Sequence, residues 1–149
     1  MMESFDDLSI HDNEIVKYDV NFSSKQIVLY TKNKINEEVN IIFSEVFSYF
    51  FENPLQKNIL LDIEIDSLEN FIKKENTLLS KGKKYGWPKS YKNLEELLLE
   101  MKKQRINYYR VFSSEGLSGW VLAEQYCKKT RRQGDGRLKT RGRQTEKKD

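Results

Sequence analysis

The sequence has few of the side chains on which catalytic and metal sites are usually built. Its 149 residues include one cysteine, Cys127, and one histidine, His11. A single cysteine excludes an internal disulfide bond and a cysteine-rich zinc site, and it suits a reducing cytoplasm. His11 lies in a polar stretch without a partner to orient its ring, so we expect a solvated side chain and no catalytic role. The two counts predict a protein without a metal or a cofactor.

Long hydrophobic runs are missing as well. No stretch approaches the roughly 20 apolar residues that a membrane-spanning helix needs. The first residues, MMESFDDLSIHDNE, are acidic and lack a hydrophobic segment, which predicts that there is no signal peptide. Glycine-rich phosphate loops are absent too, because GLSG and GDG have neither the required spacing nor a strand-to-helix context. We therefore expect a soluble cytoplasmic protein of one domain that does not bind membranes.

The net charge of +3 averages two unlike parts of the chain. Residues 128–149 carry ten Lys/Arg and three Asp/Glu, a net charge of +7, which leaves −4 for residues 1–127. The basic segment has no aromatic residue and one large apolar side chain, Leu138, so its composition predicts disorder. The expected organisation is a polar leader over residues 1–12, a single domain over residues 13–127 and then this disordered basic tail.

The cations of the tail could bind a polyanion without sequence preference, and with a steep dependence on salt. Ordering each backbone residue costs about 1–2 kcal/mol, and the tail has little apolar surface to offset that cost. We therefore expect truncation after Lys129 to leave the urea midpoint nearly unchanged. The nucleic-acid-binding candidates in this segment are Arg131, Arg132, Arg137, Lys139, Arg141 and Arg143.

Alternation of apolar and polar residues predicts the strands of the domain. EIVKYDVNF and KQIVLYT are separated by a short turn and indicate a β-hairpin, and EEVNIIF indicates a third strand. SEVFSYFFEN fits either a short helix beginning at Ser44 or a further strand. NYYRVF and GWVLAEQYC, joined by SSEGLSG, predict a closing hairpin. The apolar face of the first strand comprises Val16, Tyr18, Val20 and Phe22.

Two helices are expected in the middle of the chain. Asp66 and Glu69 have the spacing of a capping box, and the apolar stripe after them predicts a helix that runs from Leu68 to Leu79. KGKKYGWPKS ends this helix, and a second one begins near Asn93. The fold class is therefore α+β: a mostly antiparallel sheet of about five to six strands with two to three helices packed on one face.

NILLDIEID is the clearest strand, and it carries the strongest candidate for chemistry. Alternation places Asp62, Glu64 and Asp66 on one face, about 6.5–7 Å apart. Three such carboxylates could hold a divalent cation or act as an acid–base pair. The alternative is an ordinary solvent-facing side of a half-buried strand, and we favour it because such alternation is the default in an antiparallel sheet. The apolar face comprises Ile59, Leu61, Ile63 and Ile65, and Leu60 shares the carboxylate face.

Two further side chains have a functional and a structural interpretation. The cations Lys128 and Lys129 could lower the pKa of Cys127 and make its thiol reactive, but a half-buried structural thiol is the expected role. Trp87, between Gly86 and Pro88, is either a partner-binding residue or an anchor that fixes its loop.

Three stretches carry a resemblance to a known group. ILLDIEI before a helix, KKYGWP after that helix and the hairpin YRVFSSEGLSGWVLAE, all within roughly residues 11–127, resemble YxiG-like proteins of Bacillus and its relatives. That group is encoded beside genes for wall-associated, polymorphic toxins. The resemblance implies a small cytoplasmic α+β protein that acts as an immunity protein by binding a toxin domain. It carries no functional residues over to this chain.

The favoured hypothesis is a non-enzymatic, immunity-type module that binds a basic toxin domain through an acidic face. The partner-binding candidates are Glu37, Glu38, Asp62, Glu64 and Trp87. The alternative is a nucleic-acid-associated protein that binds through its basic tail.

Overall fold

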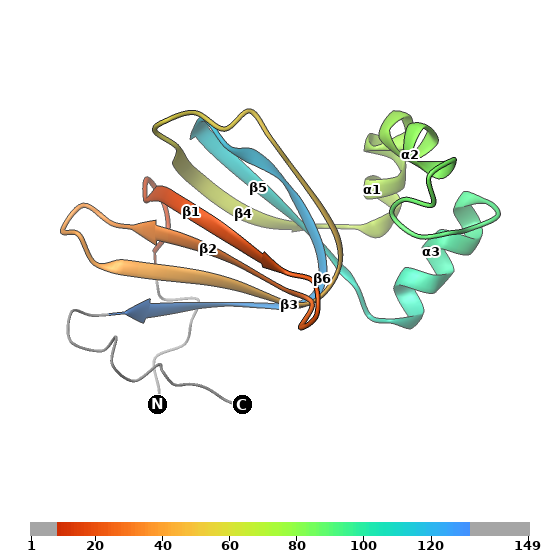
Figure 1. Ribbon diagram of the computed structural model, residues 1–149, viewed down its shortest axis with the longest axis horizontal. Helices are drawn as coiled ribbons and strands as arrows, with labels where there is room; N and C mark the ends of the chain where they lie inside the picture. The colour runs from red at the N-terminus through yellow and green to blue at the C-terminus, as the bar shows by residue number, and fades with distance from the viewer. Residues whose placement is uncertain (1–8, 132–149) are drawn as a thin grey trace.

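The computed structural model describes residues 9–131, which form a barrel of six strands with three helices at one end (Figure 1). All paired strands are antiparallel, and the three helices lie between the fourth and fifth strands in the chain. The predicted α+β class is confirmed. The strands are β1 (Glu14–Asn21), β2 (Gln26–Lys32), β3 (Glu38–Glu52), β4 (Ile59–Asp66), β5 (Asn107–Glu115) and β6 (Ser118–Arg131), and the helices are α1 (Leu68–Lys74), α2 (Asn76–Lys83) and α3 (Leu94–Lys103).

The sheet closes on itself in the order β1-β2-β3-β6-β5-β4. Its longest ladder joins β3 to β6, whereas β1 and β4 meet only over a short seam. At this seam the Ile15 amide donates to the carbonyl of Asn58, and the Leu60 amide donates to the carbonyl of Asn13, both at 2.8 Å. Closure was not predicted from the sequence, because the seam involves residues outside the regular strands.

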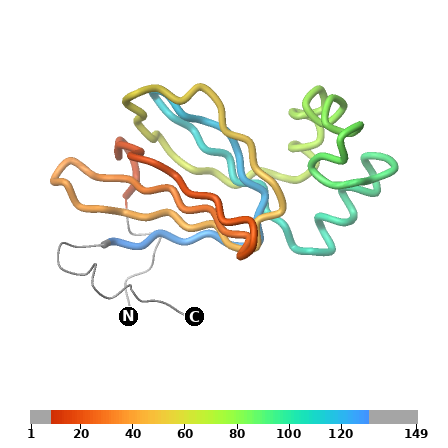
Figure 2. Tube along the Cα trace, viewed as in Figure 1, coloured from red at the N-terminus to blue at the C-terminus, as the bar shows by residue number. Residues whose placement is uncertain are grey.

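β3 resolves the ambiguity of SEVFSYFFEN, which is strand from Ser44 to Glu52. Glu45 has a φ of 52°, and the register with β6 shifts between Val46 and Ser48. These two irregularities bend β3 sharply near its middle, so that the strand contributes to two sides of the barrel (Figure 2). Its first half pairs with both β2 and β6, and its second half pairs with β6.

β-Bulges in two strands change which side chains face the core, compared with the faces predicted from the sequence. In β4 the register shifts on either side of Leu60, so Leu60 is fully buried while Leu61 and Ile65 are exposed. In β1 a shift after Ile15 buries that residue and leaves Val16 exposed. An extra residue inverts the alternation on one side of the bulge, which is why the predicted faces, Val16-Tyr18-Val20-Phe22 and Ile59-Leu61-Ile63-Ile65, are each wrong in part.

The helices pack on the outer face of the barrel at one end and form a second apolar core there. Phe71 of α1 contacts Tyr108 and Trp120 edge-on, with ring centroids 5.1 Å and 4.8 Å apart. Trp120 of β6 is itself buried. The buried members of this core are Leu68, Phe71, Leu79, Leu97, Met101, Ile106, Tyr108, Trp120 and Leu122.

The helix boundaries differ from the prediction at the first helix. Ser67 is the N-cap of α1, where its hydroxyl accepts a 3.0 Å hydrogen bond from the Asn70 amide, so the predicted capping box of Asp66 and Glu69 is wrong by one residue. Glu75 separates α1 from α2, so the predicted single helix is two. The cap of α3 is as predicted: the Asn93 side chain accepts from the Glu96 amide at 2.8 Å.

The folded unit extends beyond the predicted domain of residues 13–127 at both ends. Ile10 is buried in the barrel core, and β6 continues past Cys127 to Arg131, with Lys128 buried. The remainder of the predicted leader and basic tail, including Arg132, Arg137, Lys139, Arg141 and Arg143, lies outside the described residues.

Candidate binding groove beside strand β3

The four acidic candidates do not form one face. Asp62 and Glu64 are exposed on the outside of β4, which neighbours β5 and β1 in the sheet. Glu37 and Glu38 lie at the start of β3, between β2 and β6. The Glu37 carboxylate accepts a 3.0 Å hydrogen bond from the Asn33 side chain, so it supports the β2–β3 turn.

The carboxylates of β4 also have a basic neighbour that the sequence pattern did not indicate. Glu64 stands opposite Arg110 across the β4–β5 ladder, and Arg110 lies 3.4 Å from Asp66. Asp66 accepts hydrogen bonds from the Asn70 side chain and the Ser67 amide, both at 2.7 Å. Hydrogen bonds from Asn70 and Ser67, followed by the charge of Arg110, hold the pKa of Asp66 below its usual range. Asp66 therefore has a structural role in joining β4 to α1.

Burial shifts two further titratable groups, Tyr108 and Cys127, away from neutral pH. Burial raises the pKa of Tyr108 to about 12, with the charge of Glu75 adding to the rise. Burial likewise raises the pKa of Cys127, against the opposing effect of Lys129, so a thiol activated by cations is not what the fold provides. Within residues 9–131 no three His, Cys, Asp or Glu side chains are grouped in a way that could hold a metal ion.

A groove of about 580 Å³ lies beside the second half of β3, and we call it the β3 groove. One wall is the end of the β1–β2 hairpin, where Phe22 is 80% exposed. The other wall is β3 itself, and Trp87 from the α2–α3 connection closes one side. The lining residues are Val20, Asn21, Phe22, Lys25, Gln26, Ile27, Val46, Phe47, Ser48, Tyr49, Phe50, Phe51 and Trp87.

The lining places the groove along a strand edge and not over a strand face. All six consecutive residues of Val46–Phe51 contribute to it, although successive side chains of a strand point to opposite faces. β2 pairs with β3 only as far as Ser44, and the last backbone contact on that side is the Val46 amide donating to the Lys25 carbonyl at 2.9 Å. Among residues 9–131 no strand pairs with this edge of β3 beyond Val46.

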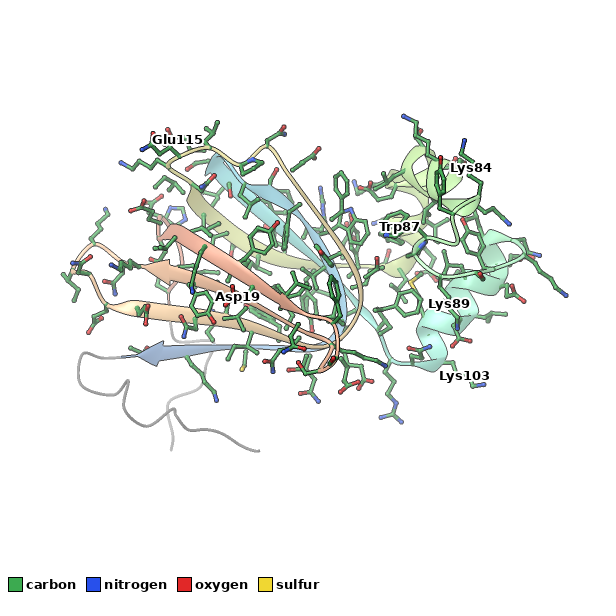
Figure 3. All side chains as sticks on the ribbon, viewed as in Figure 1. Asp19, Lys84, Trp87, Lys89, Lys103 and Glu115 are labelled. Atoms are coloured by element: carbon green, nitrogen blue, oxygen red, sulfur yellow. The ribbon has the colours of Figure 1, made fainter. Side chains whose placement is uncertain are left out.

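Trp87 combines the two roles that the sequence left open. Its indole packs against Trp120, with ring centroids 6.0 Å apart, and lies against Gly82 of α2. It is therefore an anchor that fixes the α2–α3 connection between the barrel and the helices (Figure 3). It is also half-buried and lines the β3 groove, so it is the one predicted partner-binding residue that the fold brings to this groove.

Sequence reasoning missed the other groove residues because they depend on where β2 stops pairing with β3. The aromatic run from Phe47 to Phe51 was the available signal, since so many large apolar side chains cannot all face one core. No described helix has the length and apolar character needed to cross a membrane. Comparison of the chain with known protein families, with curated proteins and with solved structures finds no match.

Proposed function

We propose that the protein is a non-enzymatic binding module that holds an extended segment of a partner protein in the β3 groove. One observation carries the proposal. The six consecutive residues Val46–Phe51 line the groove, and no strand within residues 9–131 pairs with the edge of β3 that faces it. An open edge of this kind is a template for another strand, and proteins normally cover or charge such edges.

Strand addition would use both the open backbone edge of β3 and the aromatic side chains that line the groove. The backbone of β3 would supply main-chain hydrogen bonds, while Phe22, Tyr49 and Trp87 would receive the side chains of the bound segment. Burying an exposed aromatic ring contributes about 1.5–3 kcal/mol, so a few such contacts account for specific binding. The expected ligand is an extended peptide with alternating apolar residues.

The partner we propose is a bacterial toxin domain, in line with the resemblance to YxiG-like proteins. In this view Asp62 and Glu64, which are exposed on β4, accelerate the encounter with a basic partner without lining the groove. Glu37 and Glu38 lie at the start of a different strand and would act only through the long-range field.

The proposal is tested by selecting binding peptides from a random displayed library against the full-length protein. We expect peptides with alternating apolar residues, and we expect their binding to slow amide hydrogen exchange in β3 after Val46. Phe22→Asp should weaken binding about fivefold or more, because Phe22 is exposed and its replacement leaves the core intact. The matched control is Leu99→Asp, which removes another largely exposed apolar side chain, from α3 and away from the groove.

Peptides that bind without protecting β3, or that bind equally well to the Phe22→Asp protein, would contradict the use of this groove. The toxin assignment has a separate test, in which the chain is co-expressed with toxin domains encoded by neighbouring genes. Rescue of growth that Phe22→Asp abolishes and Leu99→Asp preserves is the expected result. Absence of rescue by the unaltered chain would remove the immunity role.

A further inference from the structure

Residues 81–92 form a second surface, which we call the lysine–aromatic loop. Its sequence, KGKKYGWPKSYK, contains five lysines, three aromatic residues and no acidic residue. It comprises the last turn of α2 and most of the connection to α3. Figure 3 places Lys84 and Lys89 on this helical side of the molecule, away from the barrel.

The loop is held in a defined conformation by its own backbone. The amides of Tyr85 and Trp87 both donate to the Gly82 carbonyl, at 2.9 Å and 3.0 Å. The ammonium group of Lys83 donates to the Tyr91 carbonyl at 2.9 Å and lies 4.9 Å from the centre of the Tyr91 ring. The charged side chains are therefore presented from a preorganised framework, which reduces the entropic cost of binding.

Only one of the five lysines of the loop has an acidic partner among the described residues. Lys89 forms a 3.2 Å ion pair with Glu100, and Lys83 is engaged by Tyr91. Lys81, Lys84 and Lys92 are exposed and form no ion pair with any described residue. Their positive charges are available to an anionic partner.

Tyr85 is the exposed aromatic residue of the loop, and it lies beside one of these lysines. It is 79% exposed, and the ammonium group of Lys84 lies 5.4 Å from its ring centre. The described fold leaves this ring in solvent, in contrast to the rings of Trp87 and Tyr91, which pack against the helical core. A planar, exposed ring beside cations matches a ligand that has both phosphates and flat bases.

We propose that the lysine–aromatic loop binds single-stranded nucleic acid, with a base stacked on Tyr85 and phosphates beside Lys81, Lys84 and Lys92. Stacking needs an unpaired base, which favours a single strand over a duplex. The charge pattern supports the choice of a polyanion over a neutral partner. This surface is distinct from the β3 groove, and its function does not depend on the proposed peptide binding.

The test compares full-length variants for binding to a fluorescent oligothymidylate as a function of salt. In Lys81→Gln/Lys84→Gln/Lys92→Gln, the slope of log K against log salt should fall by about 2, since each phosphate contact contributes roughly 0.7 for a single strand. The affinity at 50 mM salt should fall on the order of a hundredfold. The control Lys32→Gln/Lys34→Gln/Lys57→Gln changes the net charge equally at exposed positions of the barrel. The basic residues after Lys128 are present in every variant, so they do not account for a difference between the loop and control variants.

Stacking is tested separately at Tyr85. Tyr85→Ala should lower the affinity about fivefold or more without changing the salt slope, and Tyr85→Trp should restore it. Equal losses in the loop and control triple variants would overturn the proposal. So would unchanged binding by Tyr85→Ala, an equal affinity for the duplex, or equally strong binding to phosphatidylserine vesicles, because each would indicate a general polyanion surface.

Discussion

Gly82 packs directly against the indole of Trp87, so closely that a Cβ at position 82 would lie 2.5 Å from the Cε3 atom of Trp87. The same two residues are joined by a 3.0 Å hydrogen bond from the Trp87 amide to the Gly82 carbonyl. Because Trp87 lines the β3 groove and also supports the lysine–aromatic loop, this contact positions both proposed binding surfaces.

Gly82→Ala should displace the Trp87 ring and lower the free energy of unfolding by about 1–3 kcal/mol, because the added methyl group overpacks a well-filled contact. The measurements are urea unfolding and the emission of Trp87 in a Trp120→Phe background. The cycle with Trp87→Ala tests the indole contact: without the indole, Gly82→Ala should cost clearly less, although the carbonyl oxygen and Cβ of residue 87 still lie 3.1 Å and 3.2 Å from the added methyl group. An equal loss of stability with and without the indole would contradict this account.

Gly119→Ala should be among the most destabilising single substitutions in the chain. A Cβ at Gly119, whose φ is 153°, would lie 1.9 Å from the Phe50 carbonyl oxygen, and a backbone atom cannot move aside without opening the β3–β6 ladder. We expect a loss of about 3 kcal/mol or more, or failure to fold. Ser118→Ala, one residue earlier in the same strand, is the control and should change stability by less than about 1 kcal/mol.

Asp66 should make stability depend on pH in the acidic range. Its folded-state pKa lies below the usual value of 3.8, through hydrogen bonds from Asn70 and Ser67 and the charge of Arg110. The ionised carboxylate therefore stabilises the fold above the unfolded-state pKa, and this contribution disappears as the pH falls through the folded-state pKa. Asp66→Asn should lower stability at pH 7, and its difference from the unaltered chain should shrink below about pH 4. Urea unfolding at several pH values measures this, and a difference that is constant with pH would refute the assignment.

Cys127 should react slowly with alkylating reagents. Burial raises the pKa of its thiol, so less thiolate is present at pH 7 than in an unperturbed cysteine. The rate of reaction with iodoacetamide should be several-fold lower in the folded chain than in urea, and its pH profile should have a higher apparent pKa in the folded chain than in urea. An alkylation rate that levels off near pH 7 would indicate an activated thiol.

Truncation should distinguish the contribution of the end of β6 to stability from that of the basic segment that follows it. A chain that ends at Arg131 keeps the pairing of Thr130 with Val39 and of Arg131 with Glu38, so its urea midpoint should equal that of the full chain. A chain that ends at Lys129 loses these pairs, and we expect a small decrease in the midpoint at an unchanged slope. A large decrease for the chain ending at Arg131 would show that residues 132–149 contribute to stability.

Much of the fold follows from local sequence patterns. Alternation in KQIVLYT and NYYRVF predicted strands because a half-buried strand needs one apolar face, and Asn93 predicted the start of α3 because its side chain can accept from a free amide. The class of the fold and the division between an acidic body and a basic C-terminal segment also followed from composition and order.

The binding surfaces depend on pairing between distant residues, which local patterns do not encode. The bulge at Leu61 and the bend at Glu45 arise from the register against β5 and β6, and they decide which side chains are buried. The β3 groove exists because β2 stops pairing with β3 at Ser44, while β6 continues beside it to Glu52. The tertiary structure therefore decided where an edge remained open, because a strand edge has no signature in the sequence of that strand alone.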